Sequence, residues 1–206
     1  MSYGTPSFGD VTFSPGASVL LTGEAAGTRG LLYDAVADGL AEGESAVVIT
    51  TNDAPERVVA ALDDRTDLDP ERLALVDATG EGEDTRVDGI TVRAVGSTGD
   101  LTGLSLAFAK QLKLLEERGS ADRVRVGLDS VSTLLMYSEV QTVFRFLHVF
   151  TSRLGSADLF GLFTLTPGMH DDQETNTVRT LFDSEAAVSD DEVALRGSGY
   201  ASPPSD

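Results

Sequence analysis

Residues 123–165 read RVRVGLDSVSTLLMYSEVQTVFRFLHVFTSRLGSADLFGLFTL, and they predict a strand, a helix and a second strand in that order. The stretch from Val124 to Leu128, apolar except for Arg125, ends in Asp129, a pattern typical of a buried strand that stops at a polar residue. Leu159 to Leu165 is a second, nearly continuous apolar strand. Between the two strands, apolar residues recur at the spacing of three and four that an amphipathic helix requires: Val140, Val143, Phe144, Leu147, Phe150 and Leu154.

The same alternation continues on both sides of this stretch. Upstream, residues 19–21, 46–50, 73–76 and 90–95 are expected to be strands, residues 30–41 a helix, and Pro55 the opening of a short helix. A further helix carries Leu101, Leu104, Phe108, Leu112 and Leu115 at helical spacing, and residues 81–88 form an acidic loop. Downstream, Asp171 and Glu174 have capping-box spacing for a helix that reaches Phe182, and Val188 and Val193 belong to a terminal hairpin.

Strands alternating with helices predict an α/β fold, in which a mostly parallel central sheet has helices on both faces. No internal repeat and no linker interrupts the pattern. We therefore expect residues 1–196 to form a single domain and residues 197–206 a disordered C-terminal tail.

The composition narrows the setting in which the chain works. It has no cysteine, which excludes disulfides and thiolate metal sites. No apolar run approaches the ~18 residues of a membrane span, and Met1 to Asp10 lacks the basic and apolar regions of a secretory signal. These observations predict a cytoplasmic protein with no membrane partner.

The charge balance is strongly acidic. Asp and Glu number 34 against 15 Lys and Arg, a formal net charge of -19, and the only lysines are Lys110 and Lys113. Self-repulsion of this size destabilises a compact state in dilute buffer, whereas molar salt shortens the Debye length to ~3 Å. We therefore predict a halophilic protein. A surface this acidic also excludes nucleic acid as a partner, since phosphate contacts rest on lysine and arginine.

Residues 19–30, VLLTGEAAGTRG, have the strand–turn–helix context of a phosphate-binding loop. Aligned from Gly23 with G-x-x-x-x-G-K-[ST], Gly27 stays within the turn, Thr28 stands for the second glycine, Arg29 for the lysine and Gly30 for the Ser or Thr. The Thr28 Cβ disfavours a positive φ, the planar guanidinium of Arg29 does not reproduce an ammonium, and Gly30 has no hydroxyl for Mg²⁺. The loop is thus a degenerate Walker A motif.

Two other interpretations of this turn stand beside the first. Thr22-Gly23 with Gly27 and Gly30 resembles the dinucleotide turn of short-chain dehydrogenases, with Asp53 placed for a ribose. That family's catalytic Tyr-x-x-x-Lys motif is absent, because the residues four positions before Lys110 and Lys113 are Leu106 and Ala109 rather than tyrosine. Alternatively, the glycines only permit a tight strand-to-helix turn.

Residues 123–183, which continue the opening stretch as TPGMHDDQETNTVRTLFD, resemble the KaiC-like branch of the RecA superfamily, in particular short KaiC-related proteins of haloarchaea. The resemblance covers roughly residues 14–187, and it implies a RecA-like P-loop fold. It also implies that the strand from Val124 to Asp129 is the Walker B strand, so that Asp129 is the carboxylate near Mg²⁺. The alternative role for Asp129 is to cap the turn that follows.

In active KaiC-like domains, paired glutamates after the second strand activate the attacking water. The resemblance places Asn52 and Asp53 at those positions. An Asn52 amide is no base near neutral pH, and the Asp53 side chain is one methylene shorter than glutamate. These are vestigial catalytic positions, and joint change at two segments indicates that hydrolysis has been lost.

The remaining polar candidates favour structural roles. His170 beside Asp171 and Asp172 has no third ligand nearby, so helix capping is preferred to a metal site. His148 falls among apolar helical positions and is expected in packing or at the surface. Arg145 and Arg153 are expected to be solvated, rather than arginine fingers aimed at a neighbouring protomer.

The sequence therefore predicts a pseudo-ATPase: a RecA/KaiC-like domain kept for regulation, signalling or protein interaction. It would require no cofactor and would assemble with itself, with RecA-like relatives or with another protein. The alternatives are an ATPase in which Arg29 replaces the lysine and Asp53 acts as base, and a sensor that binds Mg-ATP without turnover.

Overall fold

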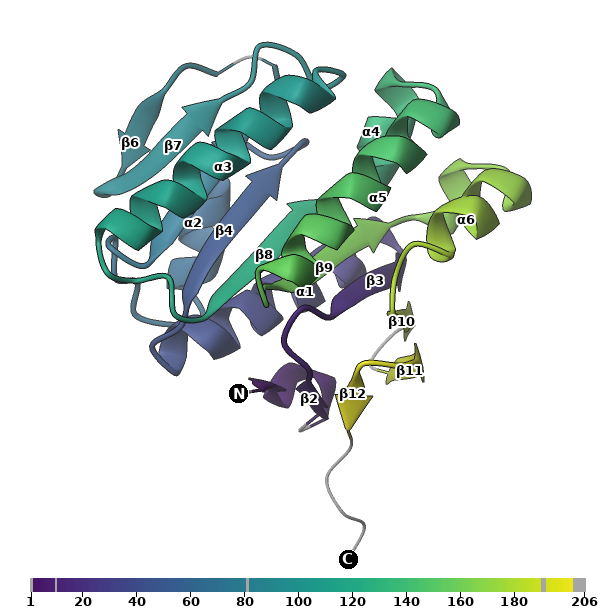
Figure 1. Cartoon of the computed structure of the whole chain (residues 1–206), viewed down its shortest axis with the longest axis horizontal. Coiled ribbons are helices and arrows are strands. Elements are labelled where there is room, and N and C mark those ends of the chain that lie inside the picture. The colour runs from purple at the N-terminus through teal and green to yellow at the C-terminus, as the bar shows by residue number, and fades with distance from the viewer. Residues whose placement is uncertain (1, 10, 81, 190–191, 202–206) are drawn as a thin grey trace, which may run out of the picture.

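A nine-stranded, mostly parallel sheet forms the centre of the protein (Figure 1). The computed structural model describes residues 2–9, 11–80, 82–189 and 192–201. The strand order is β11-β10-β3-β9-β8-β4-β5-β7-β6, and only the two outermost pairs, β10–β11 and β6–β7, are antiparallel. The strands are β3 (Ser18–Gly23), β4 (Ser45–Thr50), β5 (Leu73–Asp77), β6 (Thr85–Val87), β7 (Ile90–Ala94), β8 (Val124–Asp129), β9 (Phe160–Leu165), β10 (Ser184–Ser189) and β11 (Glu192–Gly197).

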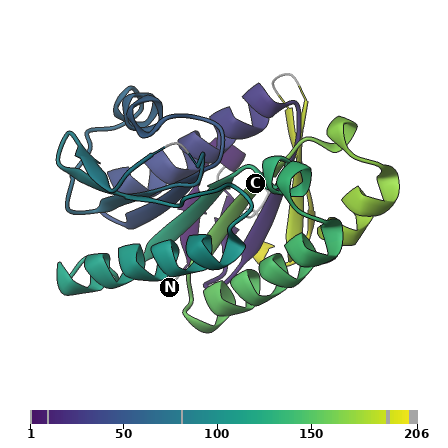
Figure 2. The ribbon, with the colours of Figure 1, turned by 90° about the horizontal axis from the view of Figure 1, so that it is seen from above.

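Helices cover both faces of this sheet, as predicted (Figure 2). One face carries α1 (Ala25–Ala41) and α2 (Pro55–Asp63), and the other carries α3 (Leu101–Glu117), α4 (Val131–Tyr137), α5 (Val140–Ser156) and α6 (Asp172–Arg179). Successive residues of a strand point to opposite faces, so β4 feeds both cores. Val48 packs in the core under α1, whereas Val47 and Ile49 pack in the core under α3 and α5. Strands buried on both faces explain the continuous apolar runs in the sequence.

The strand order excludes the dinucleotide interpretation of residues 19–30. In a dinucleotide-binding sheet the first and second strands are neighbours. Here β3 and β4, the strands before and after α1, are separated by β9 and β8. After β3 the chain passes through α1 to β4, and the two positions between these strands are filled later in the sequence by β8 and β9.

A small second sheet lies beside the N-terminus and corrects the expected tail. It consists of β1 (Tyr3–Thr5), β2 (Val11–Phe13) and β12 (Tyr200–Ala201), with the 3-10 turn η1 (Pro6–Phe8) between the first two strands. We predicted disorder from Gly197 onward, but Gly197 ends β11, and Tyr200 pairs with Phe13. The Tyr200 ring also packs 6.0 Å from the Phe13 ring, a contact that local sequence does not reveal. Residues 202–206 lie outside the described residues.

Several element boundaries differ from the sequence prediction. Helix α1 begins at Ala25 rather than near Gly30, and α6 ends at Arg179 rather than at Phe182. The expected acidic loop contains the edge strand β6, because Asp88 and Gly89 both adopt positive φ and form a two-residue hairpin turn. Residue 81 of that segment lies outside the described residues. The expected hairpin is confirmed, with Val188 paired to Val193.

Among the described helices, none has the length and apolar character needed to cross a bilayer.

Candidate functional site

Arg29, Asp53 and Asp129 meet at the carboxyl ends of the central strands. Arg29 lies in the second turn of α1, Asp129 is the last residue of β8, and Asp53 follows β4. The Arg29 Nε atom lies 2.6 Å from Asp129 Oδ2, and an Arg29 terminal guanidinium nitrogen lies 3.0 Å from Asp53 Oδ2. We call these three residues the ion triad. The structure thus brings together the three charged residues that the sequence singled out from separate segments.

Asp129 is held from two sides. Its side chain is only 2% exposed, and its Oδ1 accepts a hydrogen bond of 2.8 Å from the Thr164 hydroxyl on β9. The Asp129 carbonyl accepts a bond of 2.7 Å from the backbone N–H of Thr51, which anchors the end of β8 to the segment after β4. Both carboxylate oxygens of Asp129 therefore have partners within the protein.

Asp53 is positioned by a tight turn after β4. The Thr50 hydroxyl donates to the Asp53 carbonyl at 2.7 Å and accepts from the Asp53 N–H at 3.1 Å. This turn directs the carboxylate toward Arg29. A second cation, Arg57, lies 3.8 Å from Asp53 Oδ1, but its side chain is 81% exposed and adds little.

The charges of the triad reinforce one another. Burial by itself disfavours the Arg29 cation, but the carboxylates of Asp129 and Asp53 more than offset that cost and raise the pKa of Arg29. Tyr33, one turn further along α1, is buried, and its pKa is raised by burial first and by the same two carboxylates second. Its hydroxyl has no hydrogen-bond partner among the described residues. The triad is a net negative site, since two carboxylates face one guanidinium.

Asn52 does not join Asp53 at the triad, although the two residues are adjacent in sequence. The Asn52 Oδ1 accepts a hydrogen bond of 2.8 Å from the Thr133 hydroxyl on α4. Thr133 in turn lies 3.0 Å, oxygen to oxygen, from the hydroxyl of Ser130, the N-cap residue of that helix. The two residues expected at the catalytic positions therefore have different side-chain partners: Asp53 contacts Arg29, whereas Asn52 contacts Thr133.

The glycine-rich segment forms a helix where the sequence suggested a loop. Only Glu24 separates β3 from α1, so Gly27, Thr28 and Gly30 are helical. The Thr28 N–H bonds to the Glu24 carbonyl at 3.0 Å, and the buried Thr28 hydroxyl also bonds within this turn. Gly23 is required for a different reason than phosphate binding, because a Cβ there would lie 2.4 Å from the Val188 carbonyl oxygen of the neighbouring strand.

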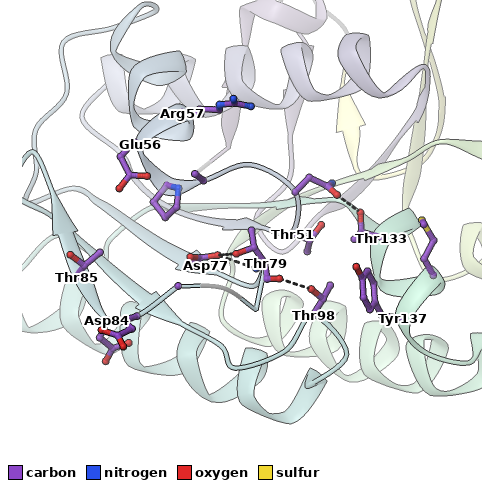
Figure 3. A pocket seen from close by; sticks show the side chains of 16 residues that line it. Thr51, Glu56, Arg57, Asp77, Thr79, Asp84, Thr85, Thr98, Thr133 and Tyr137 are labelled. Atoms are coloured by element: carbon purple, nitrogen blue, oxygen red, sulfur yellow. Dashed lines mark hydrogen bonds between the residues drawn. The ribbon is translucent and has the colours of Figure 1, made fainter.

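A cavity of about 860 Å³ opens beside the triad, at the carboxyl ends of β4 and β5 (Figure 3). Its floor holds Asp77, the last residue of β5, whose Oδ1 accepts bonds from the N–H and hydroxyl of Thr79 at 3.0 and 2.7 Å. Four acidic side chains and one basic side chain line the cavity: Glu56, Asp77, Glu83, Asp84 and Arg57. Sequence reasoning missed this site, although an acidic residue that ends a buried strand is the same signal that identified Asp129.

The other candidates take structural positions. Asp171 caps α6, accepting a hydrogen bond of 2.7 Å from the Glu174 N–H, while His170 Nδ1 lies 3.9 Å from the Glu174 carboxylate. Within residues 2–9, 11–80, 82–189 and 192–201, no group of three possible ligands could hold a metal ion. His148 is exposed on α5 and stacks with Phe144, and Arg145 and Arg153 are exposed on the same helix.

Comparison with known proteins identifies the family. A family model, described as a family of unknown function (DUF7504), matches residues 16–188. The chain belongs to this family. The match spans every strand of the sheet from β3 to β9 and most of β10, including all three residues of the ion triad.

Solved structures show that this member of DUF7504 has a KaiC-like RecA fold. The KaiC-like protein PH0186 from the hyperthermophilic archaeon Pyrococcus horikoshii OT3 superposes with a TM-score of 0.58 at 13% identity, over 85% of this chain and 72% of that one. The uncharacterized protein PH0321 from Pyrococcus horikoshii, solved in complex with an unknown peptide, gives 0.64 at 14% identity, over 83% and 76%. No curated protein matches the sequence.

Proposed function

We propose that this chain is a non-hydrolysing RecA/KaiC-like domain, a pseudo-ATPase that serves protein interaction or regulation in a halophile cytoplasm. The observation that carries the proposal is the ion triad. The Arg29 guanidinium lies between the two carboxylates that resemblance assigns to metal binding and to catalysis. The Arg29 guanidinium, carried by α1, thus supplies positive charge to carboxylates that would face a metal ion in a nucleotide-binding relative.

The chain does not fit Mg-ATP at this position. A phosphate-binding loop presents free backbone N–H groups around the phosphates. Here Glu24 alone connects β3 to α1, and the Thr28 N–H is bonded within the helix. The Arg29 side chain that replaces the lysine is occupied by Asp129 and Asp53. Gripping a triphosphate would require breaking two ion pairs and unwinding the first turn of α1.

Electrostatics near the triad also disfavour a polyphosphate. The adjoining cavity carries one basic side chain, Arg57, against four acidic ones. The whole chain has a formal charge of -19, so an incoming anion meets repulsion at long range as well. These charges support the loss of nucleotide binding at this site, and they argue equally against nucleic acid as a partner.

If the RecA/KaiC-like fold is retained without ATP hydrolysis, binding to another protein is a role that the fold can still serve. The candidates are a second copy, a RecA-like relative or an unrelated protein. PH0321, which shares this fold, was solved with a peptide bound. That complex supports peptide or protein recognition as a use to which the fold can be put.

The proposal is tested by titrating Mg-ATP into the protein in 3 M KCl in a calorimeter and by measuring phosphate release under the same conditions. We expect no saturable heat and no turnover above that of the Asp53→Asn/Asp129→Asn double variant. Saturable binding without turnover would instead make the protein a nucleotide sensor. Turnover that the double variant abolishes would refute the pseudo-ATPase and establish an ATPase with arginine in the lysine position.

The regulatory role needs a separate measurement. The ATP hydrolysis rate of a purified KaiC-like relative from the same organism is followed as this chain is added. We expect a saturable change in that rate, and the Asp53→Asn/Asp129→Asn variant serves to show whether the effect needs the triad. A rate that stays constant with every such relative would remove RecA-like proteins from the list of partners.

A further inference from the structure

Strand β11 forms one edge of the central sheet. It is six residues long, pairs with β10 in continuous register from Glu192 to Gly197, and contains no proline. Within the described residues, no strand pairs with its outer side. Natural proteins usually shield such an edge with a bulge, a proline, a lysine or a covering segment. The opposite edge, β6, is only three residues long, so the exposed length is concentrated at β11.

The backbone of β11 presents hydrogen-bonding groups to the outside at Val193 and Leu195. The Ser198 N–H donates to the Asp183 carbonyl at 2.8 Å, which sets the alternation of the β10–β11 ladder. By that alternation Glu192, Ala194 and Arg196 bond to β10, whereas the N–H and C=O groups of the residues between them point outward. The Tyr200 hydroxyl donates to the Leu195 carbonyl at 3.4 Å, in keeping with an outward carbonyl, which retains a second lone pair.

The side chains of β11 are arranged symmetrically about Ala194. Glu192 and Arg196 lie two residues before and two residues after it, both exposed, on one face of the strand. Neither side chain forms an ion pair within the described residues. Val193 and Leu195 lie on the other face, where they are half-buried against the core under α1.

We propose that two copies of this chain dimerise by antiparallel pairing of β11 with β11 about a twofold axis at Ala194. Glu192 of each copy then faces Arg196 of the other, and Val193 faces Leu195. The outward N–H and C=O groups of these two apolar residues bond across the axis. Two central alanines face each other in a non-hydrogen-bonded pair, where Cα atoms approach to about 4.5 Å and a small side chain is required.

A second copy is the occupant that the local pattern of charges along β11 favours. Both copies carry a formal charge of -19, so their approach needs a place where opposite charges meet. Glu192 and Arg196 each lie two residues from Ala194, so antiparallel self-pairing about Ala194 forms two Glu192–Arg196 pairs, one on each side of the axis. Only this arrangement forms both pairs. This inference rests on β11 alone and does not depend on the state of the ion triad.

Cysteine cross-linking tests the axis directly, because the chain has no cysteine of its own. The Ala194→Cys variant is oxidised in 3 M KCl and run on a non-reducing gel. Facing Cα atoms at the expected distance lie within the range of a disulfide, so most of the protein should become a covalent dimer. Arg86→Cys, on the exposed edge strand β6, is the matched control and should remain largely monomeric. Equal cross-linking of the two variants would overturn the proposal.

Charge reversal tests the pairing in solution. Sedimentation equilibrium at 0.5 M KCl, with folding checked by circular dichroism, should show a dimer for the unmodified chain. Arg196→Glu should raise the dimer dissociation constant by roughly threefold to tenfold, because two attractive pairs become repulsive. The Glu192→Arg/Arg196→Glu double variant should restore the original value. A chain that sediments as a monomer, or a double variant that fails to recover, would contradict β11 self-pairing.

Discussion

The guanidinium of Arg29 contacts the carboxylate of Asp129 at 2.6 Å, across 100 residues of sequence. One residue belongs to α1 and the other ends β8, and neither has an equivalent partner within its own segment. The Asp129 side chain is 2% exposed, whereas that of Arg29 is 28% exposed at the rim.

Replacing Arg29 with alanine should destabilise the protein by about 2–3 kcal/mol, because it leaves Asp129 buried without its cation. Urea unfolding in high salt measures the change. Arg57→Ala is the control, since that exposed arginine lies 3.8 Å from Asp53 and should cost less than about 0.5 kcal/mol. Adding Asp129→Asn to Arg29→Ala should recover part of the loss. If the double variant were no more stable than Arg29→Ala, the loss would not be electrostatic.

Restoring a Walker A signature should not restore nucleotide binding. In the Thr28→Gly/Arg29→Lys/Gly30→Thr variant, which restores all three positions, the ammonium can still pair with Asp129, and we expect α1 still to begin at Ala25. The missing part is the loop, because the segment is helical from Ala25 and the Thr28 N–H is already bonded to the Glu24 carbonyl. Calorimetry with Mg-ATP should give no saturable signal, as for the unmodified chain. Micromolar binding by this variant would show that the first turn of α1 opens readily.

Salt should stabilise the fold strongly. With a formal charge of -19, self-repulsion acts over a Debye length of ~10 Å at 0.1 M salt and ~3 Å at 1 M. Thermal unfolding followed by circular dichroism should therefore show a midpoint that rises steadily from dilute buffer to 3 M KCl. A sodium sulfate series at matched ionic strength separates screening from general salting-out. A midpoint independent of KCl would refute the halophilic interpretation.

Tyr33 should make the protein lose stability above about pH 10. Its pKa is raised in the folded state by burial and by the nearby Asp129 and Asp53 carboxylates, whereas an unfolded tyrosine ionises near pH 10. A raised folded pKa contributes stability that is complete below the unfolded pKa and is lost as pH rises from there toward the folded value. Tyr33→Phe should flatten that part of the pH–stability curve.

At pH 7 the Tyr33→Phe variant should be about as stable as the unmodified chain, because the hydroxyl has no partner among the described residues. Melting curves at pH 7 and pH 11 give both comparisons. Tyr200→Phe is the control at a half-buried tyrosine, where it removes only the long bond to Leu195. A steep loss of stability in both variants alike would show that groups other than Tyr33 titrate.

Patterns local in the chain were enough to predict the class of fold. Burial leaves a periodic pattern in the sequence of a single element. Strands buried on both faces, such as β4, β8 and β9, are mostly apolar throughout, whereas α5, buried on one face, has a stripe of apolar residues at helical spacing. The Asp171 cap is also local, since it satisfies N–H groups three residues away. The hairpin of β6 and β7 was not predicted from the sequence, although Asp88-Gly89 is a dipeptide that favours a two-residue hairpin turn.

Contacts distant in the chain decided the site. Residues 24–30 could be a loop or a helix by local preference, and packing of α1 against β8 and β9, with Arg29 drawn to Asp129, selects the helix. Asn52 and Asp53 are neighbours in sequence, yet they turn to different partners because α4 and α1 approach β4 from opposite faces. Strand β12 likewise exists only because β2 lies beside it. Periodicity is a property of each segment, whereas the pairing of charges depends on distances that exist only once the sheet has assembled.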